Sequence, residues 1–264
     1  WVGFSNFISL FGGGGLTSTF GYAFVRVLGW TLVWAFFATF TTYIGGILLS
    51  LLLNSKKTRL SKMWRTLFIV TIAVPQFVSL LLVRNFFSNG GIVNTICHSI
   101  GLTGFLRSIG LVSTSYIPFL SAPGWAHVMI ILINIWIGVP YQMLIATGVL
   151  MNLPSDQLES ARVDGATNFQ IFRKITLPII KPIMAYTLVT SLIGGIQMFD
   201  VPQILTNGNG NPDRTSMTAI MYLNKHLFSK NYGMAGALSV VLFILTTVLS
   251  LIVFKVTGND KRKG

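Results

Sequence analysis

The sequence predicts an all-α membrane protein, a polytopic helical bundle with five transmembrane helices. Of its 264 residues, 52% are hydrophobic and only 9% are charged, against roughly 25% charged in an average soluble domain. Five stretches are apolar over the length of about 20 residues that a helix needs to cross a bilayer. Basic residues gather between these stretches. This composition excludes a disordered chain, a collagen-like chain and an ordinary cytosolic enzyme.

The five predicted spans are apolar on every face, as expected of helices that meet lipid or lie inside a bundle. They cover Val27–Leu53, Thr66–Phe87, Trp125–Leu150, Ile183–Leu205 and Tyr232–Val256. Proline occurs inside or near the ends of three spans, at Pro75, Pro140 and Pro202. Membrane helices tolerate proline where neighbouring groups satisfy the freed carbonyls, so we expect kinks there.

The positions of the basic residues predict the topology. Thirteen of the 19 Lys and Arg residues lie between spans one and two, between spans three and four, and at or after the end of span five. The positive-inside rule places those segments in the cytoplasm: they are residues 54–65, 151–182 and 257–264. The external segments are then 1–22, 88–124 and 206–231. The net charge of +13 is therefore a topology signal, and no nucleic-acid partner is expected. The C-terminus is expected in the cytoplasm.

The beginning of the chain is interpreted as an external lead-in with a flexible Gly12–Gly15 run. An external start without a signal peptide is unusual. We therefore expect an earlier transmembrane helix in the intact protein, which would then have six, and the full gene would establish it. Residues 1–264 are interpreted as a single transmembrane domain.

Side chains that could bind a metal or carry catalysis are few and scattered. Cys97 is the only cysteine, and His98, His127 and His226 do not form pairs at metal-ligand spacing. We expect Cys97 to be an apolar filler, with no metal site and no catalytic residue.

Local rules divide the cytoplasmic segment between spans three and four into two short helices. Ser155 or Asp156 can cap the first helix, and Glu159 lies near its start, where a carboxylate suits the helix dipole. Gly165 can end this helix, because glycine adopts the left-handed conformation readily.

The second helix of this segment is predicted to begin at Thr167. Thr167 and Gln170 have the spacing of a capping box, and Pro178 is expected to stop the helix. Two short helices joined at a glycine predict a compact protrusion.

This segment resembles the EAA loop of ABC importer permeases. The resemblance rests on Glu159, Ser160, Ala161, Asp164, Gly165, Ala166, Ile175, Leu177 and Pro178. Gly165 follows Glu159 by six residues, as the family's glycine follows its glutamate, and Ser160 replaces the usual first alanine. In that family the loop is a coupling helix that docks into a cleft of a cytoplasmic ATPase. The resemblance therefore implies that these residues, Ser160 aside, couple the chain to an ATPase. A plain amphipathic hairpin, with Glu159 paired only to Arg162, is the alternative.

More of the chain resembles the carbohydrate branch of this family, the permeases of the MalF type. The similar pieces include Gly3–Phe7, Phe199–Asp200, Leu205–Gly208 and Tyr232–Gly233. The resemblance implies the type I ABC importer permease fold and a place in the cytoplasmic membrane of a bacterium or archaeon. The implied substrate is a carbohydrate, with an oligosaccharide as the expected form.

The resemblance also implies partners. They are a second, MalG-like permease subunit, two ABC ATPase subunits and an external solute-binding protein, with membrane lipid around the spans. The chain has no G-x-x-x-x-G-K-[ST] run to hold a nucleotide. We therefore expect no cofactor on this chain and no catalysis by it, with ATP and magnesium on the ATPase subunits.

Polar residues inside spans three and four are the candidates for the substrate path. They are Asn134, Tyr141, Gln142, Gly194, Gly195, Gln197 and Asp200. An ionised aspartate at a helix centre costs about 2.5–3.5 kcal/mol on insertion scales, so Asp200 should face a cavity or the external interface. The alternative is that these groups only bond neighbouring helices. We interpret Trp136 as a packing or lipid-facing group.

In the external segment 88–124, Ile92, Ile96 and Ile100 recur every four residues. This spacing predicts a short helix on the membrane face or on the next subunit. With residues 207–231 it would form the surface that the solute-binding protein meets, unless the segment is only a connector.

Two other classes compete with the ABC permease. A secondary transporter or channel would usually hold ionisable groups near the midplane. Here the spans contain only Asp200 for certain, with Arg26 and Arg84 near span ends, and no inverted repeat is visible. A membrane-embedded hydrolase would need a His-Glu-x-x-His run or a Ser/His pair within a span, and neither occurs.

Overall fold

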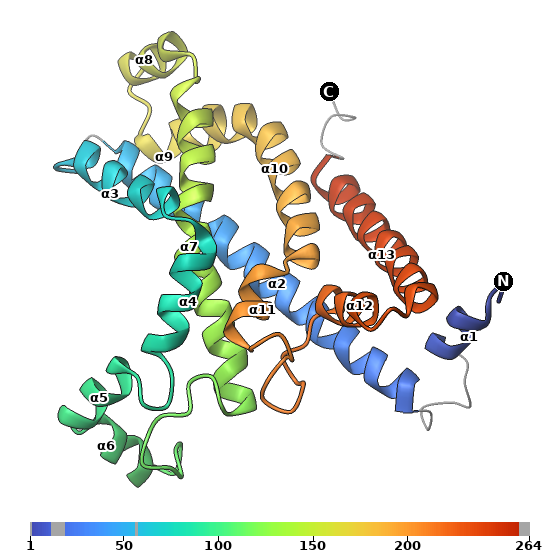
Figure 1. Ribbon diagram of the computed structural model, residues 1–264. Coiled ribbons are helices and arrows are strands. Elements are labelled where there is room, and N and C mark those ends of the chain that lie inside the picture. The colour runs from blue at the N-terminus through green and yellow to red at the C-terminus, as the bar shows by residue number, and fades with distance from the viewer. Residues whose placement is uncertain (1, 12–18, 56–57, 259–264) are drawn as a thin grey trace. The chain divides into compact units, whose positions relative to one another are not determined.

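The structure is a computed structural model that describes residues 2–11, 19–55 and 58–258. In these ranges the regular elements are helices, without a strand (Figure 1). Helices long and apolar enough to span a membrane cover Ala23–Asn54, Pro123–Met151, Asn168–Leu205 and Tyr232–Val256. A broken pair, Ser61–Ala73 and Gln76–Phe86, makes a fifth if it counts as one span. The all-α prediction is confirmed.

Most elements follow one another with short connections, and the longer ones are 109–122 before α7 and 206–218 before α12. The first part of the chain contains α1 (Ser5–Phe11), α2 (Thr19–Asn54), α3 (Ser61–Ala73), α4 (Gln76–Phe86), α5 (Ile92–Ser99) and α6 (Leu102–Ser108). The second part contains α7 (Pro123–Met151), α8 (Ser155–Val163), α9 (Asn168–Ile171), the π-helical η2 (Phe172–Thr176), α10 (Leu177–Gln197), α11 (Asp200–Leu205), α12 (Ala219–Phe228) and α13 (Tyr232–Gly258). The predicted Gly12–Gly15 run, Lys56, Lys57 and the tail 259–264 lie outside the described residues.

The second predicted span is not one helix. It is broken at Val74 and Pro75 into α3 and α4, so the expected kink at Pro75 is a full break. Pro75 has φ −53° and ψ 126° and precedes the first residue of α4. Proline has no N–H to donate and keeps the residue before it out of the α-helical region, which explains the break.

Proline has a smaller effect in the later spans. α7 continues through Pro140, and Pro202 lies inside the separate short helix α11. The prediction that Pro178 stops a helix is wrong, because α9, η2 and α10 follow one another without a break. A proline ring collides with the carbonyl group four residues earlier in an α-helix. The wider π turn directly before Pro178 relieves that position.

The chain forms two compact units that do not follow sequence order. Unit 1 contains Trp1–Ala38, Val74–Asn134 and Gly195–Leu245, and unit 2 contains Thr39–Ala73, Ile135–Gly194 and Thr246–Gly264. Each of the helices α2, α7, α10 and α13 contributes to both units, which are therefore not consecutive domains. The single transmembrane domain stays a prediction.

Unit 1 is held together by α1, α2, α12 and α13. The buried side chains of Leu10, Phe24 and Leu238 form one apolar cluster. A hydrogen bond also joins α12 to α2. The fully buried Thr31 hydroxyl donates to the carbonyl of Val27 (2.7 Å) and accepts from the backbone N–H of Ala219 (2.8 Å). That N–H is one of the first in α12, which have no partner within the helix.

In unit 2, α2 and α7 approach closely through glycine. A Cβ atom on Gly46 would lie 2.5 Å from Cβ of Gln142 and 2.9 Å from the backbone nitrogen of Met143. Small residues let membrane helices pack at short range. A hydrogen bond between the hydroxyls of Ser50 and Thr147, 3.0 Å apart, adds a polar contact between the same helices.

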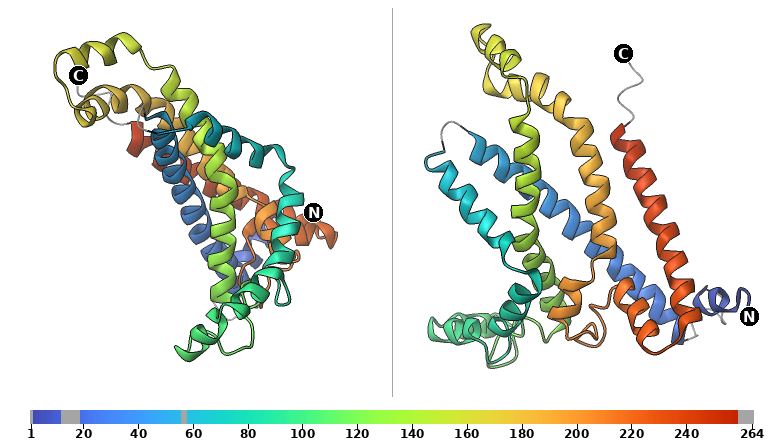
Figure 2. Two further views of the ribbon diagram at one scale, coloured as in Figure 1. Left: turned by 90° about the vertical axis from the view of Figure 1, so that its left-hand side faces the viewer. Right: turned by 45° about the horizontal axis from the view of Figure 1, so that its top comes forward.

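The segment 88–124, which is predicted to be external, contains α5 and α6, which lie side by side in Figure 2. The predicted short helix is confirmed at Ile92 and Ile96, whereas Ile100 is its C-cap, and all three side chains are exposed. Asn94, on the same helix, is buried and donates to the carbonyls of Ser88 (3.1 Å) and Ile117 (3.0 Å). α5 is therefore anchored through Asn94, and the described residues leave its apolar row uncovered.

Candidate functional site: the α8–α9 hairpin and the exposed face of α10

The α8–α9 hairpin, residues 155–171, projects beyond the adjoining ends of α7 and α10 in both views of Figure 2. α8 ends in a Schellman motif at Gly165, whose φ is +79°. The N–H of Ala166 donates to the carbonyl of Ala161 (2.9 Å), and the N–H of Gly165 donates to the carbonyl of Arg162 (3.1 Å). These bonds satisfy carbonyls at the end of α8. The prediction that Gly165 ends the helix is confirmed.

The start of α8 differs from the prediction. Pro154 holds the N-cap position, with φ −65° and ψ 107°, and no side chain caps the helix. The Ser155 hydroxyl donates instead to the carboxylate of Asp156 (3.1 Å). The fixed φ of proline suits the last extended residue before a helix, so the helix begins one residue earlier than a Ser155 cap would require.

The start of α9 agrees with the prediction. The backbone N–H of Gln170 donates to the Thr167 hydroxyl (3.3 Å), and the backbone N–H of Thr167 donates to Oε1 of Gln170 (2.8 Å). This reciprocal pair is the capping box. Since η2 and α10 follow without a break, α9 is the first turn of a long helix.

The predicted coupling residues fall into two groups. Five surround the Schellman turn: Glu159, Asp164 and Gly165 are exposed, and Ala161 and Ala166 are half-buried. The other three lie on the following helix: Ile175 is half-buried in η2, and Leu177 and Pro178 are exposed at the start of α10. The turn therefore brings together the first group only.

Two exposed apolar side chains beside the turn were missed by the sequence analysis. Val163 is 87% exposed and Phe169 is 69% exposed. Both lie near Gly165 in a segment that is otherwise mostly polar. An isolated apolar residue in such a segment is the sequence feature that could have identified them. Glu159 and Arg162 are both described and form no ion pair with each other. The alternative in which Glu159 pairs only with Arg162 is therefore not observed.

The exposed face of α10 changes from apolar to polar along the helix. Ile183, Tyr186, Thr190, Gly194 and Gln197 are exposed and recur at intervals of three or four residues, the spacing of one helix face. Polar groups in contact with lipid tails are costly. The Thr190 hydroxyl donates within its own helix, to the carbonyls of Tyr186 (3.2 Å) and Thr187 (3.0 Å). The exposed amide of Gln197 is therefore the group on this face that suits a water-filled path or another chain. Thr190 was not predicted, although its spacing to Gly194 marked it.

Other candidates in the spans have different surroundings. Asp200 is exposed in the first turn of α11. The Gly195 carbonyl, near the end of α10, accepts from Nε1 of the buried Trp34 (3.1 Å), so Gly195 serves contact between helices. Asn134 and Gln142 are buried, the latter packed on Gly46.

Span three also exposes aromatic side chains. Tyr141 is 59% exposed and Trp136 is 51% exposed. In the described residues no three His, Cys, Asp or Glu side chains lie close enough to hold a metal ion. The absence of a metal or cofactor stays an expectation.

Long apolar helices joined by a protruding polar hairpin define a multi-pass membrane protein. Residues 43–258 match the family described as binding-protein-dependent transport system inner membrane component. The chain belongs to this family.

Curated relatives cover nearly all of the chain. It is 31% identical over 272 residues to a galactooligosaccharides transport permease, GanP of Bacillus subtilis, covering all of this chain and 61% of that protein. It is 29% identical to the maltodextrin permease MalC of Streptococcus pneumoniae and to the maltose/maltodextrin permease MalF of Escherichia coli, covering 97% of this chain in each case. The chain spans 58% of MalC and 49% of MalF.

Solved structures agree in fold. A bacterial ABC transporter that imports the acidic polysaccharide alginate matches with a TM-score of 0.76 at 24% identity, over 100% of this chain and 85% of that one. The MetNI methionine ABC transporter matches with a TM-score of 0.52 at 17% identity, over 92% of this chain and 98% of that one. The predicted fold of an ABC importer permease is confirmed.

Proposed function

We propose that this chain is a transmembrane permease subunit of a binding-protein-dependent ABC importer for a carbohydrate, with an oligosaccharide as the expected form. Family membership and the names of the relatives support the transport class and the sugar. The observation that carries the coupling role is the α8–α9 hairpin, whose backbone is fixed at Gly165 and whose apolar Val163 and Phe169 are uncovered.

The hairpin is the proposed docking point for a cytoplasmic ATPase subunit. Val163 and Phe169 provide apolar contact, and Glu159 and Asp164 face basic groups of the partner. Exposed apolar side chains commonly mark protein interfaces. Because α9 runs through η2 into α10, a displacement of the hairpin is carried into a spanning helix without an intervening loop.

The polar part of the α10 face is the proposed wall of the substrate path. Thr190, Gly194 and Gln197 line it, and a second, MalG-like permease subunit covers it. Sugars are recognised by hydrogen bonds and aromatic faces, and Tyr141 is a further exposed candidate. Asn134, Gln142 and Gly195 support the helices that carry this face.

The division of labour follows from the same proposal. The ATPase subunits bind ATP and magnesium and hydrolyse the nucleotide, so this chain has no catalytic step and holds no cofactor. An external solute-binding protein delivers the carbohydrate to residues 88–124 and 206–231. The C-terminus lies in the cytoplasm.

A detergent pull-down of the tagged, full-length protein from native membranes tests this function. We expect to recover an ABC ATPase and a second permease, in a ratio near 2:1:1 for ATPase, partner permease and this chain, read by mass spectrometry. A Val163→Asp/Phe169→Asp double variant should retain the partner permease and lose most of the ATPase, because the charges oppose burial of this surface.

An exposed charge change elsewhere on the same loop is the matched control. Met151→Asp also replaces an exposed apolar side chain with a charge, at the end of α7 before the hairpin, and should leave ATPase recovery unchanged. If the unmodified chain is recovered alone or as a homo-oligomer in several detergents, the importer proposal fails and a secondary transporter becomes the better hypothesis.

A further inference from the structure

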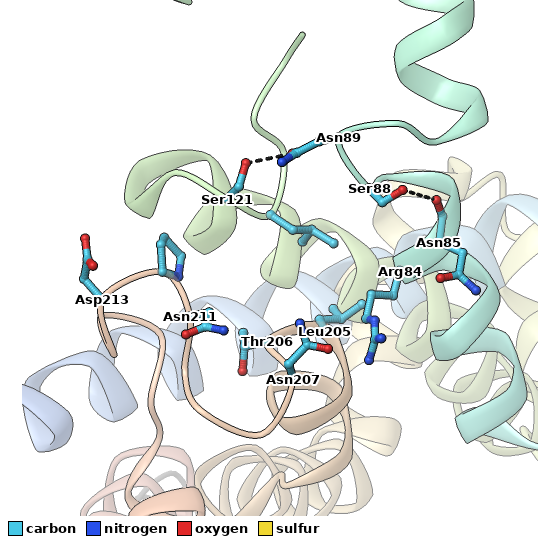
Figure 3. Close-up of a pocket in the computed structure, with 12 residues that line it drawn as sticks. Arg84, Asn85, Ser88, Asn89, Ser121, Leu205, Thr206, Asn207, Asn211 and Asp213 are labelled. Carbon is cyan, nitrogen blue, oxygen red and sulfur yellow. Dashed lines mark hydrogen bonds between the residues drawn. The ribbon is translucent and has the colours of Figure 1, made fainter. Parts of the chain in front are cut away.

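Unit 1 contains a polar pocket that involves none of the coupling or substrate-path candidates, although part of its lining lies in segments 88–124 and 206–231. Its volume is about 540 Å³, and it lies between the end of α4, the segment before α7 and the loop from α11 to α12 (Figure 3). Pockets of roughly 300–1,000 Å³ hold small organic ligands. The three segments lie at or beyond the predicted external ends of the spans, so the pocket is expected to open outside the membrane.

The lining combines groups that both donate and accept hydrogen bonds. Four are asparagines: Asn85, Asn89, Asn207 and Asn211. Three are hydroxyls: Ser88, Ser121 and Thr206. Ser88 already donates to the carbonyl of Asn85 (2.8 Å) and Ser121 to Oδ1 of Asn89 (2.8 Å), so these hydroxyls are available as acceptors. An amide or hydroxyl matches a sugar hydroxyl, which also donates and accepts. Arg84 and Asp213 add one charge of each sign, so the pocket as a whole favours a neutral polyol over an anion.

Several of these groups have bonding capacity left. Nη1 of Arg84 donates to the carbonyl of Ile204 at 3.4 Å, which leaves most of its five N–H groups available. The side chains of Asn207, Asn211 and Asp213 make no hydrogen bond within the described part of the chain. In Figure 3 they lie around the pocket from the α11–α12 loop.

The loop that supplies these side chains is fixed before any ligand binds. The Thr206 hydroxyl, buried, donates to the carbonyl of Pro202 (2.6 Å) and accepts from the N–H of Gly210 (3.2 Å). Gly210 has φ +65°, and a Cβ atom there would lie 2.5 Å from Cβ of Met217. A loop ordered in advance loses less conformational entropy when it binds.

We propose that this pocket is an external saccharide subsite, which binds one end of an oligosaccharide before the sugar enters the path along α10. The inference rests on the proposed import function and adds to it a second, outward binding site on this chain.

The test uses the full-length chain assembled with its partner permease and ATPases in nanodiscs, without the solute-binding protein. The probes are maltotetraose and a galactooligosaccharide. Hydrogen exchange should slow in residues 84–89 and 205–213 when either sugar is added. By NMR titration, Asn85→Ala and Asn207→Gly should each bind sugar about three- to tenfold more weakly, as expected for one or two lost hydrogen bonds. Glycine at 207 keeps the φ of +56°.

Asn209→Ala is the matched control, because this exposed amide lies on the same loop and does not line the pocket. Its affinity should equal that of the unmodified complex. The subsite is refuted if sugar slows exchange in neither segment of a complex that still imports sugar. It is also refuted if sugar-free binding protein slows exchange there while sugar does not, since the pocket then docks a protein.

Import into proteoliposomes with the solute-binding protein present is measured in parallel. If the complex imports sugar but sugar does not slow exchange at the pocket, only the subsite proposal is refuted. If sugar binds to the pocket but the complex shows no ATP-dependent import, the proposed import function is refuted instead.

Discussion

Gly46 and Gly165 both lie in unit 2, and their neighbourhoods differ completely. At Gly46 the backbone is an ordinary helix, and the space for a side chain is filled by Gln142 and the backbone of Met143. At Gly165 no atom lies within 4 Å of an added Cβ, but φ is +79°. The α2–α7 contact therefore depends on side-chain volume, and the α8–α9 hairpin depends on backbone conformation. The proposed scaffold and the proposed docking point should respond to different kinds of substitution.

The largest effect is expected for Gly46→Leu. The first added carbon meets Cβ of Gln142 at 2.5 Å and a backbone nitrogen at 2.9 Å, and a helix backbone cannot yield as a flexible side chain can. Overpacking typically costs about 1–3 kcal/mol and sometimes more. Thermal unfolding of the purified protein in detergent should show a clear loss of stability.

Gly148→Ala is the control for that change. Gly148 lies in α7 with open space around its Cβ position, so alanine should be neutral or stabilising by up to about 1 kcal/mol. If Gly46→Leu is as stable as Gly148→Ala, the α2–α7 contact is not set by volume.

Gly165→Val should have the next largest effect and should act locally. A side chain in the left-handed region costs roughly 1–2 kcal/mol, which would loosen the Schellman turn with little change in global unfolding. Hydrogen exchange of residues 161–170 should become faster. ATPase recovery in the pull-down should fall.

Gly165→Asn separates conformation from volume at this position. Asparagine tolerates φ > 0 better than other non-glycine residues. It should therefore restore most of the protection from hydrogen exchange and most of the ATPase recovered in the pull-down. Equal loss with Asn and Val would contradict a conformational role for Gly165.

Thr167→Ala should destabilise the start of α9 by about 1 kcal/mol, because the capping box loses its hydroxyl. Thr167→Ser keeps the hydroxyl and should behave like the unmodified protein. The measurement is again exchange of the hairpin amides. An alanine variant with unchanged exchange would show that η2 and α10 hold α9 without the box.

Val163→Ser should have the smallest effect on stability, within about 0.5 kcal/mol, because the side chain is 87% exposed. Its effect on ATPase binding should nonetheless be measurable, since the proposal buries this side chain in a partner. A quantitative binding assay with the purified ATPase measures it. Loss of stability without loss of binding would reverse the assignment.

The contrast also explains what the sequence could reveal. Gly165, Thr167 and Gln170 act through rules that span a few residues, so the turn and the capping box were predictable. Gly46 acts through Gln142, nearly a hundred residues away, and nothing local marks that contact. The Thr31 bond to Ala219, which links α2 to α12, has the same character. Only a three-dimensional arrangement reveals such pairs.

The exposure of each polar side chain is the second property that local sequence patterns could not predict. Asn134 and Gln142 are as polar as Gln197, but they are buried whereas Gln197 is exposed. The prediction that Pro178 stops a helix was wrong for another reason. The rule that proline stops a helix assumes α-helical geometry, and the π turn at η2 removes that assumption.

The π turn also sets an angular register. An α-helix advances by about 100° per residue around its axis, and a π turn accommodates one extra residue without breaking the helix. Deleting one residue within 172–176 would convert the segment to regular helix. The turns on either side would keep nearly the same angle around the axis, because the wider π turn already takes up its extra residue. The direction in which Val163 and Phe169 point relative to Thr190 thus tolerates the loss of that residue, whereas deleting a residue between Leu177 and Thr190 would turn it by about 100°.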